Sequence, residues 1–443
     1  MITGKEIHNL ARRLWRINRS ITGDGNRLTL DILKEICPEM KIYEVPSGTK
    51  VFDWTVPNEW NVKEAWIKDP SGNKIVDFEE CNLHLVGYSI PVHKTINLKQ
   101  LQNHLHSRPD LPSAIPYVTS YYNHYWGFCL SDLQRRSLCK GEYEVYVDSE
   151  LKNGSLTYGE ILLEGESKQE IFLSTYICHP SMANNELSGM TVTAYIAKWL
   201  ASLKQRQYSY RIIFIPETIG SLTYLNKNLK KMKDNIIAGF NVSCVGDDRM
   251  YSYLPSRSGN SLADQVAKHT LKFTSPDYRT FLWNDRGSDE RQYCAPGIDL
   301  PVVNMARTKS KEYPEYHTSL DDLDNVVTPT GLHGGFKMIY KAIKSIESNC
   351  YPQASVLGEP NLGSRGLYPT LGATKKIDSV HTLKNILTYS DGKTSLLEIA
   401  EKCDVFILDL LPTIKILKER NLLTIHNSPV FNFPNSINMP EAP

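Results

Sequence analysis

The sequence lacks the features that mark a membrane protein or a disordered chain. No run approaches the ~18 to 20 apolar residues that a membrane-spanning helix needs. Residues 1–19 interleave basic with apolar side chains, so they do not form the apolar core of a signal peptide. There is no internal repeat and no low-complexity tract. We therefore expect a globular protein with no membrane partner.

Paired cysteines and an excess of one charge are also missing. The nine cysteines are an odd number and include no Cys-x-x-Cys pair. We therefore expect no disulfide framework and no zinc finger, and we expect a reducing, cytoplasmic location. Fifty Lys plus Arg face 49 Asp plus Glu, which leaves a net charge of +1. That balance provides no electrostatic attraction for nucleic acid or for an anionic membrane.

Three patterns divide the 443 residues. Residues 41–150 are rich in Tyr, Trp, Val and turn residues, which predicts a small, mostly-β inserted domain. Residues 151–350 alternate apolar strands with amphipathic helices, a pattern typical of an α/β fold whose mostly parallel sheet carries helices on both faces. We expect residues 1–40 to add helices to that fold. Residues 351–443 predict a linker and a winged helix, with three short helices and a hairpin over 422–433.

Polar groups suited to metal binding follow the apolar strand predicted over residues 171–178. His179 comes at its end, Asn185 and Glu186 follow in a polar loop, and a Ser-Gly pair then opens a helix. Sites in such folds gather at the carboxyl ends of the strands, where a rigid strand end can fix a ligand. The alternative for this segment alone is that the His and the acid serve only as helix caps.

Other strand ends carry similar groups. Glu217 follows a strand over 211–216, where a partly desolvated carboxylate near a cation can act as a general base on water, or where the acid can serve only as a helix cap. Asp247 follows another strand in a Gly-Asp-Asp segment that suits either a cation ligand or a turn. His317 lies in a loop with neighbouring carboxylates that could orient its second nitrogen. Together these strand ends predict one metal-dependent site.

Taken in order, these segments resemble the motifs of zinc aminopeptidases of the M28 type, in which they carry two co-catalytic zinc ions. The chain is more closely similar to aminopeptidase-like proteins with DUF4910 and DUF2172 domains and a C-terminal winged helix. That similarity spans nearly the whole chain and implies a zinc-exopeptidase-like fold. The matching segments are Cys178-His179, residues 183–189, Glu217, Ser288-Asp289, Tyr316-His317-Thr318 and, in the insert, Asp53-Trp54-Thr55-Val56-Pro57.

Three positions depart from the M28 pattern. Asn185 stands where that family has an Asp that bridges both metals, Thr218 stands where a second Glu would bind, and Ser243 stands where an Asp would. Neutral side chains are poor ligands for two dications. One Zn²⁺ per chain is therefore expected rather than two.

The ligands of that single zinc would be His179, His317 and one carboxylate, as in mononuclear peptidases. Glu186 is the preferred carboxylate, because it lies one helical step beyond the missing Asp, and Asp247 is the alternative. The implied activity is hydrolysis of an amide bond in a small peptide or aminoacyl conjugate, with Glu217 as general base. Residues predicted to contact substrate are Asn185, Arg257, Arg286, Asp289 and Arg291, although for each arginine taken alone a surface ion pair is the favoured alternative.

Two other functions stay open. The neutral substitutions also suit a catalytically silent protein that binds a ligand or partner at the old site. The winged helix suggests a regulator, but residues 381–424 hold six Lys or Arg and six Asp or Glu. A phosphate-binding domain normally has a basic surplus, so docking or self-association into a homo-oligomer is favoured over DNA binding.

Overall fold

The structure is a computed structural model that describes residues 2–367 and 377–429, of which 377–380 are described by their backbone alone. The chain divides into two compact units. The first comprises Met1–Gln265 with Asp277–Ile339, and the second comprises Val266–Pro276 with Tyr340–Pro443. The candidate site lies wholly in the first unit.

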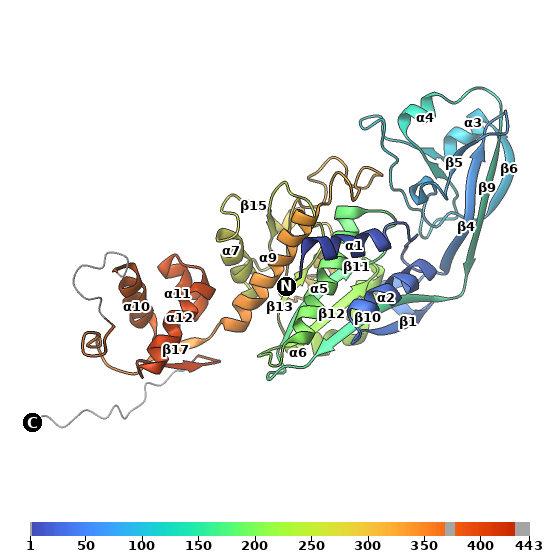
Figure 1. Ribbon diagram of the computed structural model, residues 1–443. Helices are drawn as coiled ribbons and strands as arrows, with labels where there is room; N and C mark the ends of the chain where they lie inside the picture. Colours follow the sequence, from blue (N-terminus) through green and yellow to red (C-terminus); the bar gives the residue numbers. More distant parts are fainter. Residues whose placement is uncertain (1, 368–376, 430–443) are drawn as a thin grey trace, which may run out of the picture. The chain divides into compact units, whose positions relative to one another are not determined.

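An eight-stranded sheet forms the centre of the first unit (Figure 1), in the order β1-β10-β12-β11-β13-β16-β14-β15. The four central strands are mutually parallel, whereas β1, β10 and β14 pair antiparallel with their inner neighbours. The strands are β1 Lys41–Pro46, β10 Ser155–Leu163, β12 Ser209–Ile215, β11 Glu170–Tyr176, β13 Ile236–Asn241, β16 Val302–Ala306, β14 Ser252–Leu254 and β15 Arg279–Thr280.

Helices cover both faces of this sheet, so its central strands are almost entirely buried. Every residue of β11 is buried, as expected for a parallel strand covered twice. Phe172 packs on Tyr293 of α8 on one face, with ring centroids 5.0 Å apart. On the other face Gly189 of α5 comes so close that a Cβ atom would lie 2.9 Å from Thr175 Oγ1. The predicted mostly parallel α/β fold with helices on both faces is confirmed.

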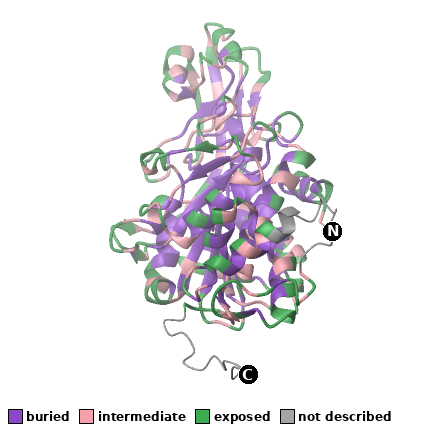
Figure 2. Cartoon of the chain, turned by 90° about the vertical axis from the view of Figure 1, so that its left-hand side faces the viewer, coloured by how far each residue is buried: buried purple, intermediate pink, exposed green. Residues whose placement is uncertain are grey.

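The helices of the first unit follow the strands in the expected alternation. The strands of the large sheet run through the buried interior of the first unit (Figure 2). α1 begins with a capping box in which Thr3 and Glu6 satisfy each other's backbone N–H groups. The helices that alternate with strands of the large sheet are α1 Gly4–Leu14, α2 Asp24–Ile36, α5 Ser188–Ser202, α6 Ile219–Asn235, α7 Leu262–Lys272, α8 Glu290–Tyr293 and α9 Pro329–Ser348. From Val266 onward α7, and from Tyr340 onward α9, belong to the second unit.

The insert is a four-stranded antiparallel sheet in the order β5-β4-β9-β6. Its strands are β4 Glu59–Lys68, β5 Lys74–Asp77, β6 Val92–Asn97 and β9 Glu142–Lys152. The boundary expected at residue 41 falls elsewhere, because β1 pairs with β10 in the large sheet. The boundary at 150 also shifts, since β9 continues to Lys152 and β10 begins at Ser155.

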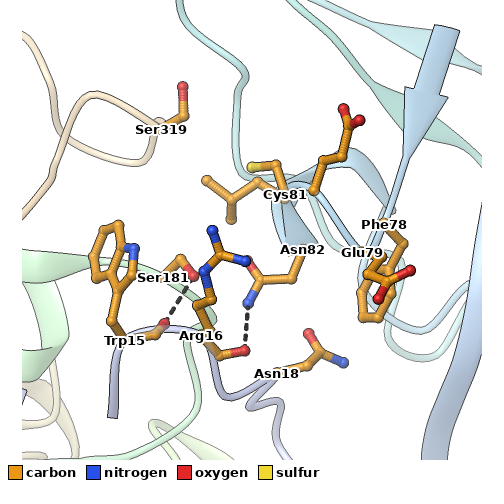
Figure 3. A pocket seen from close by; sticks show the side chains of 11 residues that line it. Trp15, Arg16, Asn18, Phe78, Glu79, Cys81, Asn82, Ser181 and Ser319 are labelled. Atoms are coloured by element: carbon orange, nitrogen blue, oxygen red, sulfur yellow. Dashed lines mark hydrogen bonds between the residues drawn. The ribbon is translucent and has the colours of Figure 1, made fainter. Parts of the chain in front are cut away.

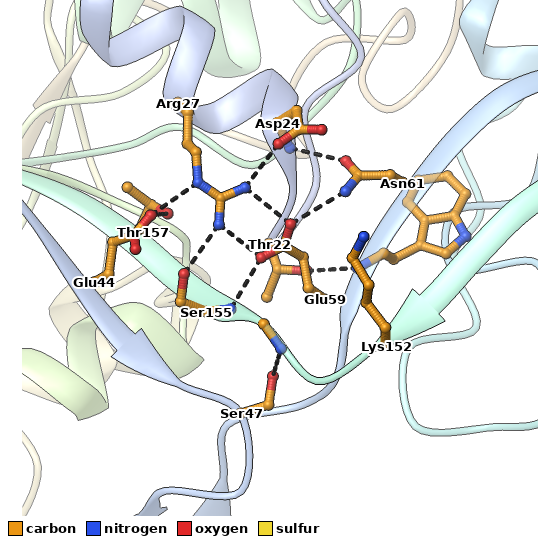
Figure 4. Close-up of polar contacts among 12 residues, drawn as sticks. Thr22, Asp24, Arg27, Glu44, Ser47, Glu59, Asn61, Lys152, Ser155 and Thr157 are labelled. Carbon is orange, nitrogen blue, oxygen red and sulfur yellow. Dashed lines mark hydrogen bonds and ion pairs between the residues drawn. The ribbon is translucent and has the colours of Figure 1, made fainter.

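Arg27 joins the insert to the large sheet (Figure 4). Its guanidinium from α2 donates to both oxygens of Glu59 at 2.8 and 2.6 Å, to Glu44 at 2.8 Å and to Ser155 Oγ at 2.9 Å. The hydrogen bonds that Arg27 donates to Glu59 are the main cause that lowers the pKa of this buried carboxyl to about 2. A bidentate Arg–carboxylate pair fixes orientation as well as distance. Arg27 therefore fixes the start of β4, which carries Glu59, relative to the large sheet.

The second unit contains the predicted three helices: α10 Ile377–Tyr389, α11 Leu396–Cys403 and α12 Ile407–Glu419. The hairpin expected over 422–433 takes another form. β18, Leu423–His426, pairs antiparallel with β17, Tyr351–Ala354, from the segment expected to be a linker. The remainder of the expected hairpin, from residue 430, lies outside the described residues.

In the described part of the chain, no helix is both long and apolar enough to cross a membrane. All nine cysteines are free thiols.

Candidate active site

His179 lies just beyond the end of β11, before a single turn of π-helix, Ala183–Leu187. The Glu186 carboxylate from that turn lies 2.5 Å from His179 Nδ1 and accepts the His179 backbone N–H at 2.8 Å. Both side chains are buried. Because a carboxylate holds Nδ1, Nε2 is the atom of His179 that can bind a ligand or exchange a proton.

A buried arginine fixes Glu186 in turn. Arg19 Nε lies 3.2 Å from Glu186 Oε1 and 3.0 Å from the His179 carbonyl oxygen, and the Arg19 and Glu186 side chains are wholly inaccessible. Burial lowers the pKa of Arg19, and the charge of Glu186 opposes that effect. A buried charge is tolerated only beside such a partner. Arg19 therefore positions the carboxylate that orients His179.

The π-helical turn is also tied to the loop that carries His317. Asp321 accepts the backbone N–H groups of Asn184 and Asn185 at 2.7 and 3.0 Å, and its own carbonyl accepts that of Ala183 at 2.9 Å. N–H groups at the start of a helical turn have no partner within the helix. Asp321 satisfies them and couples the two histidine loops.

His317 faces His179 beside the ring of Tyr117. The two imidazole centroids are 5.4 Å apart, and the Tyr117 centroid lies 5.1 Å from His179 and 5.2 Å from His317. His317 Nε2 is buried with no hydrogen-bond partner among the described residues. Burial, together with the charges of His179 and Lys311, lowers the pKa of His317 to about 3. The ring is therefore neutral at pH 7, the form that binds metals.

Glu217 follows β12 and lies on the Nε2 side of His179. Its Oε2 is 3.9 Å from that nitrogen, and its side chain is 22% exposed. Burial raises the pKa of Glu217 against the charges of His179 and Arg291. For His179, burial lowers the pKa, but the charges of Glu186 and Glu217 give a net rise. A carboxyl group with a raised pKa can accept and release a proton near neutral pH.

Asp289 supports the turn that follows Glu217. Its Oδ1 accepts the backbone N–H of Thr218 at 2.8 Å and the Ser221 hydroxyl at 2.9 Å, while its buried Oδ2 has no partner among the described residues. Burial and the charge of Glu217 raise the pKa of Asp289 to about 8. Since Asp289 is fully buried, its contacts indicate a positioning role instead of the expected substrate contact.

Two predicted ligands have other partners. Asp247 accepts Thr308 Oγ1 at 2.7 Å, the Thr308 N–H at 2.9 Å, Asn184 Nδ2 at 2.9 Å and the Arg249 N–H at 2.8 Å. Those donors occupy both oxygens, so Asp247 anchors loops and does not complete a metal site. Glu186 was expected to bind the metal together with His179 and His317, but it contacts Nδ1 of His179 and therefore does not join Nε2 at that site.

The predicted substrate-binding residues separate into two groups. Arg257 forms an exposed ion pair with Asp299, and Arg286 is exposed with its guanidinium 5.2 Å from the centroid of the Trp283 ring. Neither lines the pocket at Glu217, whereas Arg291 does. Asn185 lies in the buried turn, where its Oδ1 accepts the Tyr176 hydroxyl at 3.1 Å and its Nδ2 has no described partner.

A pocket of about 290 Å³ opens at Glu217. Its polar wall is formed by Glu217, Thr218, Arg291 and Gln292, and Arg291 donates to the Thr218 hydroxyl at 2.6 Å. Its aromatic wall comes from the insert. The aromatic side chains are Trp54, Tyr121 and Tyr122.

A second pocket, of about 210 Å³, adjoins both histidine loops (Figure 3). Ser181 and Ser319 line it, and each follows shortly after one of the two histidines. The Arg16 guanidinium points into it between Ser181 and Asn82. Ser181 Oγ donates to the Trp15 carbonyl at 2.9 Å, so the segment that follows α1 and the His179 loop share this wall.

Two imidazole donors of the kind that zinc binds face each other at this site. Two imidazoles bound to one tetrahedral zinc place their ring centroids about 5 Å apart, close to the 5.4 Å between His179 and His317, and His317 Nε2 is buried without a partner. Among the described residues no carboxylate completes a three-ligand site with them, since Glu186 and Asp247 have other partners and the donor atoms of His179, Glu217 and His317 do not all lie within 4.8 Å of one another. In the described residues such a tight group is formed by Cys178, His179 and Glu186, where Glu186 is already engaged by Arg19.

The three positions that would have to supply charged ligands for a second zinc hold neutral side chains with partners of their own. Asn185 offers a neutral amide already bonded to Tyr176, and Ser243 Oγ accepts Asn304 Nδ2 at 3.2 Å. Thr218 Oγ1 accepts a hydrogen bond from Arg291. None of these side chains carries the negative charge that a second dication would need.

Sequence reasoning missed three parts of the site. Arg19 had no signal beyond a basic residue after a helix, and its role depends on burial. Tyr117 belongs to the insert, far from His317 in the sequence. Its backbone N–H donates to the His317 carbonyl at 2.9 Å. For Asp321 a partial signal was present in the sequence, because the carboxylates near His317 were expected to orient the second nitrogen of that histidine. It binds backbone N–H groups instead.

The chain is similar to known proteins over nearly its whole length. A curated protein of Clostridium acetobutylicum, named "Putative polysaccharide biosynthesis protein with aminopeptidase-like domain", is 43% identical over 424 residues, which are 94% of this chain and 96% of that protein. The crystal structure of a putative peptidase from the same species has a TM-score of 0.89 at 42% identity and covers 95% of this chain and 96% of its own.

More distant structures share the fold alone. BSAP, a zinc aminopeptidase from Bacillus subtilis, has a TM-score of 0.56 at 12% identity and covers 77% of this chain and 95% of its own. A peptidase M28 precursor from Shewanella amazonensis has a TM-score of 0.51 at 11% identity, with coverage of 77% and 95%.

Two sequence families match the chain in succession. Residues 349–425 match the winged helix-turn-helix family HTH_47, in agreement with the three helices of the second unit. Residues 8–349 match the family described as "Domain of unknown function (DUF4910)", which spans the large sheet, the insert and both histidine loops. The chain is therefore a member of the DUF4910 family, with an aminopeptidase-like fold and a C-terminal winged helix.

Proposed function

We propose that the protein is a zinc-dependent hydrolase that cleaves an amide bond in a small substrate. The observation that carries the proposal is the facing arrangement of His179 Nε2, Glu217 and the unpartnered His317 Nε2. His179 and His317 would hold the metal. Bound there, zinc would polarise the amide carbonyl and make water more acidic.

Glu217 supplies the acid–base chemistry of the proposed reaction. Its raised pKa suits it to take a proton from the attacking water and to give that proton to the leaving amine. Glu186, held by Arg19, keeps His179 Nε2 directed to the site, and Asp289 fixes the backbone after Glu217. The carbonyl carbon gains one oxygen and loses its nitrogen, so water and an amide yield a carboxylate and an amine.

The pocket indicates a small substrate. A volume of about 290 Å³ lies at the lower end of the range for small-molecule sites. A short peptide or an aminoacyl or acylamino conjugate fits it, and the name of the Clostridium relative points to polysaccharide biosynthesis. Arg291 would bind a substrate oxygen at the mouth.

Metal analysis and one conservative variant test this function. We expect about one zinc per chain after purification without chelator. It should be lost in His179→Ala and His317→Ala and kept in the control His93→Ala, which removes an exposed histidine paired with Glu144. Glu217→Gln should keep zinc but lose at least about 100-fold in turnover. Full activity of Glu217→Gln would reject the assigned base.

A catalytically silent binding protein is the second candidate, favoured by the neutral amide of Asn185 inside the site. It predicts no stoichiometric zinc and no rescue by added metal. The winged helix supports a DNA-binding regulator less well, because residues 381–424 carry equal numbers of acidic and basic side chains. DNA retention that falls steeply with salt would be required for that function.

A further inference from the structure

Two large aromatic side chains remain exposed at the mouth of the Glu217 pocket. Trp54 is 40% and Tyr122 is 53% exposed, and both line the pocket. Their ring centroids are 6.1 Å apart at an interplanar angle of 59°. Exposed rings that sit beside a catalytic carboxylate in one pocket are typical of ligand recognition.

The insert holds these rings in place. Trp54 belongs to a hairpin of β2, Lys50–Val51, and β3, Trp54–Thr55. The Tyr122 hydroxyl donates to the Thr55 carbonyl at 3.0 Å, which ties the second ring to the same hairpin. The flanking residues Phe52 and Tyr121 have φ angles of 52° and 41°. Bulky residues in this left-handed region are strained, and such strain clusters at ligand sites.

The opposite wall of the pocket offers hydrogen-bond donors. Arg291 and Gln292 from α8 line it next to Glu217. Arg291 uses one guanidinium nitrogen on Thr218 Oγ1, and its other N–H groups can reach a ligand because a guanidinium has five. The pocket thus has an aromatic wall, a donor wall and a proton-transfer group.

We propose that this pocket binds the pyranose ring of an N-acylated amino sugar. The apolar face of the ring stacks on Trp54 and Tyr122, its hydroxyls accept hydrogen bonds from Arg291 and Gln292, and its acylamino group lies at Glu217. This inference rests on the proposed amide hydrolysis and names its substrate class. Water replaces the amine at the acyl carbon, and Glu217 returns the proton to the sugar nitrogen as the C–N bond breaks.

Half-exposed rings favour a sugar over an apolar peptide side chain. An apolar side chain gains from full enclosure, whereas Trp54 and Tyr122 leave about half of their surface in water. A pyranose has one apolar face and a polar rim, so its hydroxyls stay hydrated or bind the donors opposite while its C–H face covers a ring.

Saturation-transfer NMR on the Glu217→Gln protein tests the inference without turnover. The probes are N-acetylglucosamine and N-acetyl-leucinamide, and the variants Trp54→Ala and Tyr122→Ala are added to the Glu217→Gln background. Tyr389→Ala is the control, because Tyr389 is also exposed but does not line the pocket. Thermal melting verifies that each variant is folded.

We expect saturation of the sugar ring protons and an affinity for N-acetylglucosamine that falls about tenfold in Trp54→Ala and Tyr122→Ala but not in Tyr389→Ala. Equal affinity in all variants, or preference for N-acetyl-leucinamide, overturns the sugar assignment even if amide hydrolysis by the wild type stands. Trp54-dependent sugar binding without hydrolysis or zinc keeps the sugar site and rejects the proposed reaction.

Discussion

The Glu186 carboxylate contacts His179 Nδ1 at 2.5 Å in a buried pair that points Nε2 at Glu217. A carboxylate on the distal nitrogen of a metal-binding histidine fixes its tautomer and raises its basicity. Glu186 was expected to bind the metal directly. From its place on Nδ1 it would act on metal binding through the orientation of His179 instead.

Glu186→Gln should lower zinc affinity about 10- to 100-fold, measured by competition with a chromophoric chelator. The matched control is Glu144→Gln, which removes a carboxylate from the exposed His93 and should change nothing. Because Glu186→Gln also leaves Arg19 buried without a counter-charge, Glu186→Asp is measured beside it. An unchanged affinity in a folded Glu186→Gln protein would show that Glu186 does not orient a metal ligand.

Asp321→Asn tests the coupling of the two histidine loops. The amide would place an NH₂ group against one of the backbone N–H groups that Asp321 now accepts, so we expect a loss of about 1–3 kcal/mol in unfolding free energy. Zinc affinity should fall with it, because the turn carrying Glu186 loses its anchor. Asp324→Asn, at an exposed ion pair with Arg12, should cost less than about 1 kcal/mol in urea unfolding.

Strand ends were the part of the site that the sequence could predict. An apolar run followed by a polar residue places His179 and Glu217 at one edge of a parallel sheet whatever the details of packing. The roles of Glu186, Asp247 and Asp289 could not be predicted, because each depends on which donors meet a carboxylate after folding. The same loop residue can bind a metal, an arginine or a backbone N–H group.

Long-range pairing limited the fold prediction in a similar way. β1 reads like the strands of the insert, yet it pairs with β10, more than a hundred residues later. β17 reads as linker, yet it pairs with β18. Hydrophobic periodicity reports which face of a strand is buried but not which strand it joins.

Glu59→Gln should weaken the junction of the insert in a pH-dependent way. Arg27 lowers the pKa of Glu59 to about 2, below the ~4.3 of an unfolded glutamate. The carboxylate therefore stabilises the fold fully above about pH 4.3 and progressively less as pH falls towards 2. At pH 7 we expect a cost of about 2 kcal/mol, discounted because Arg27 is partly exposed.

Urea midpoints of wild type and Glu59→Gln at pH 7, 5 and 3 provide the measurement, with Glu150→Gln as the control from an exposed pair with Lys152. The gap between wild type and Glu59→Gln should narrow from pH 5 to pH 3. A gap that is constant with pH would mean that the ionised form of Glu59 contributes nothing specific.

His269 should make the second unit sensitive to mild acid. Its Nε2 accepts the Ile407 backbone N–H at 2.9 Å, so Nδ1 carries the proton that faces Glu401, and its ring stacks on Phe406. Burial lowers the pKa of His269 against the charge of Glu401, and Lys272 lowers it further. The unfolded chain therefore binds the proton more readily than the folded chain does.

Stability of the second unit should be full above about pH 6.5, the pKa of an unfolded histidine, and should fall below it by at most about 1.4 kcal/mol per pH unit. Hydrogen exchange of the Ile407 amide, corrected for intrinsic pH dependence, measures this in the full-length protein. Protonation removes the acceptor of that amide, so its protection should drop between pH 7.5 and 5.5.

In His269→Gln, which keeps a polar side chain but does not titrate, the drop should disappear. The control His93→Gln, which changes an exposed histidine, should retain the drop. Equal drops in wild type and His269→Gln would assign the acid sensitivity to another group.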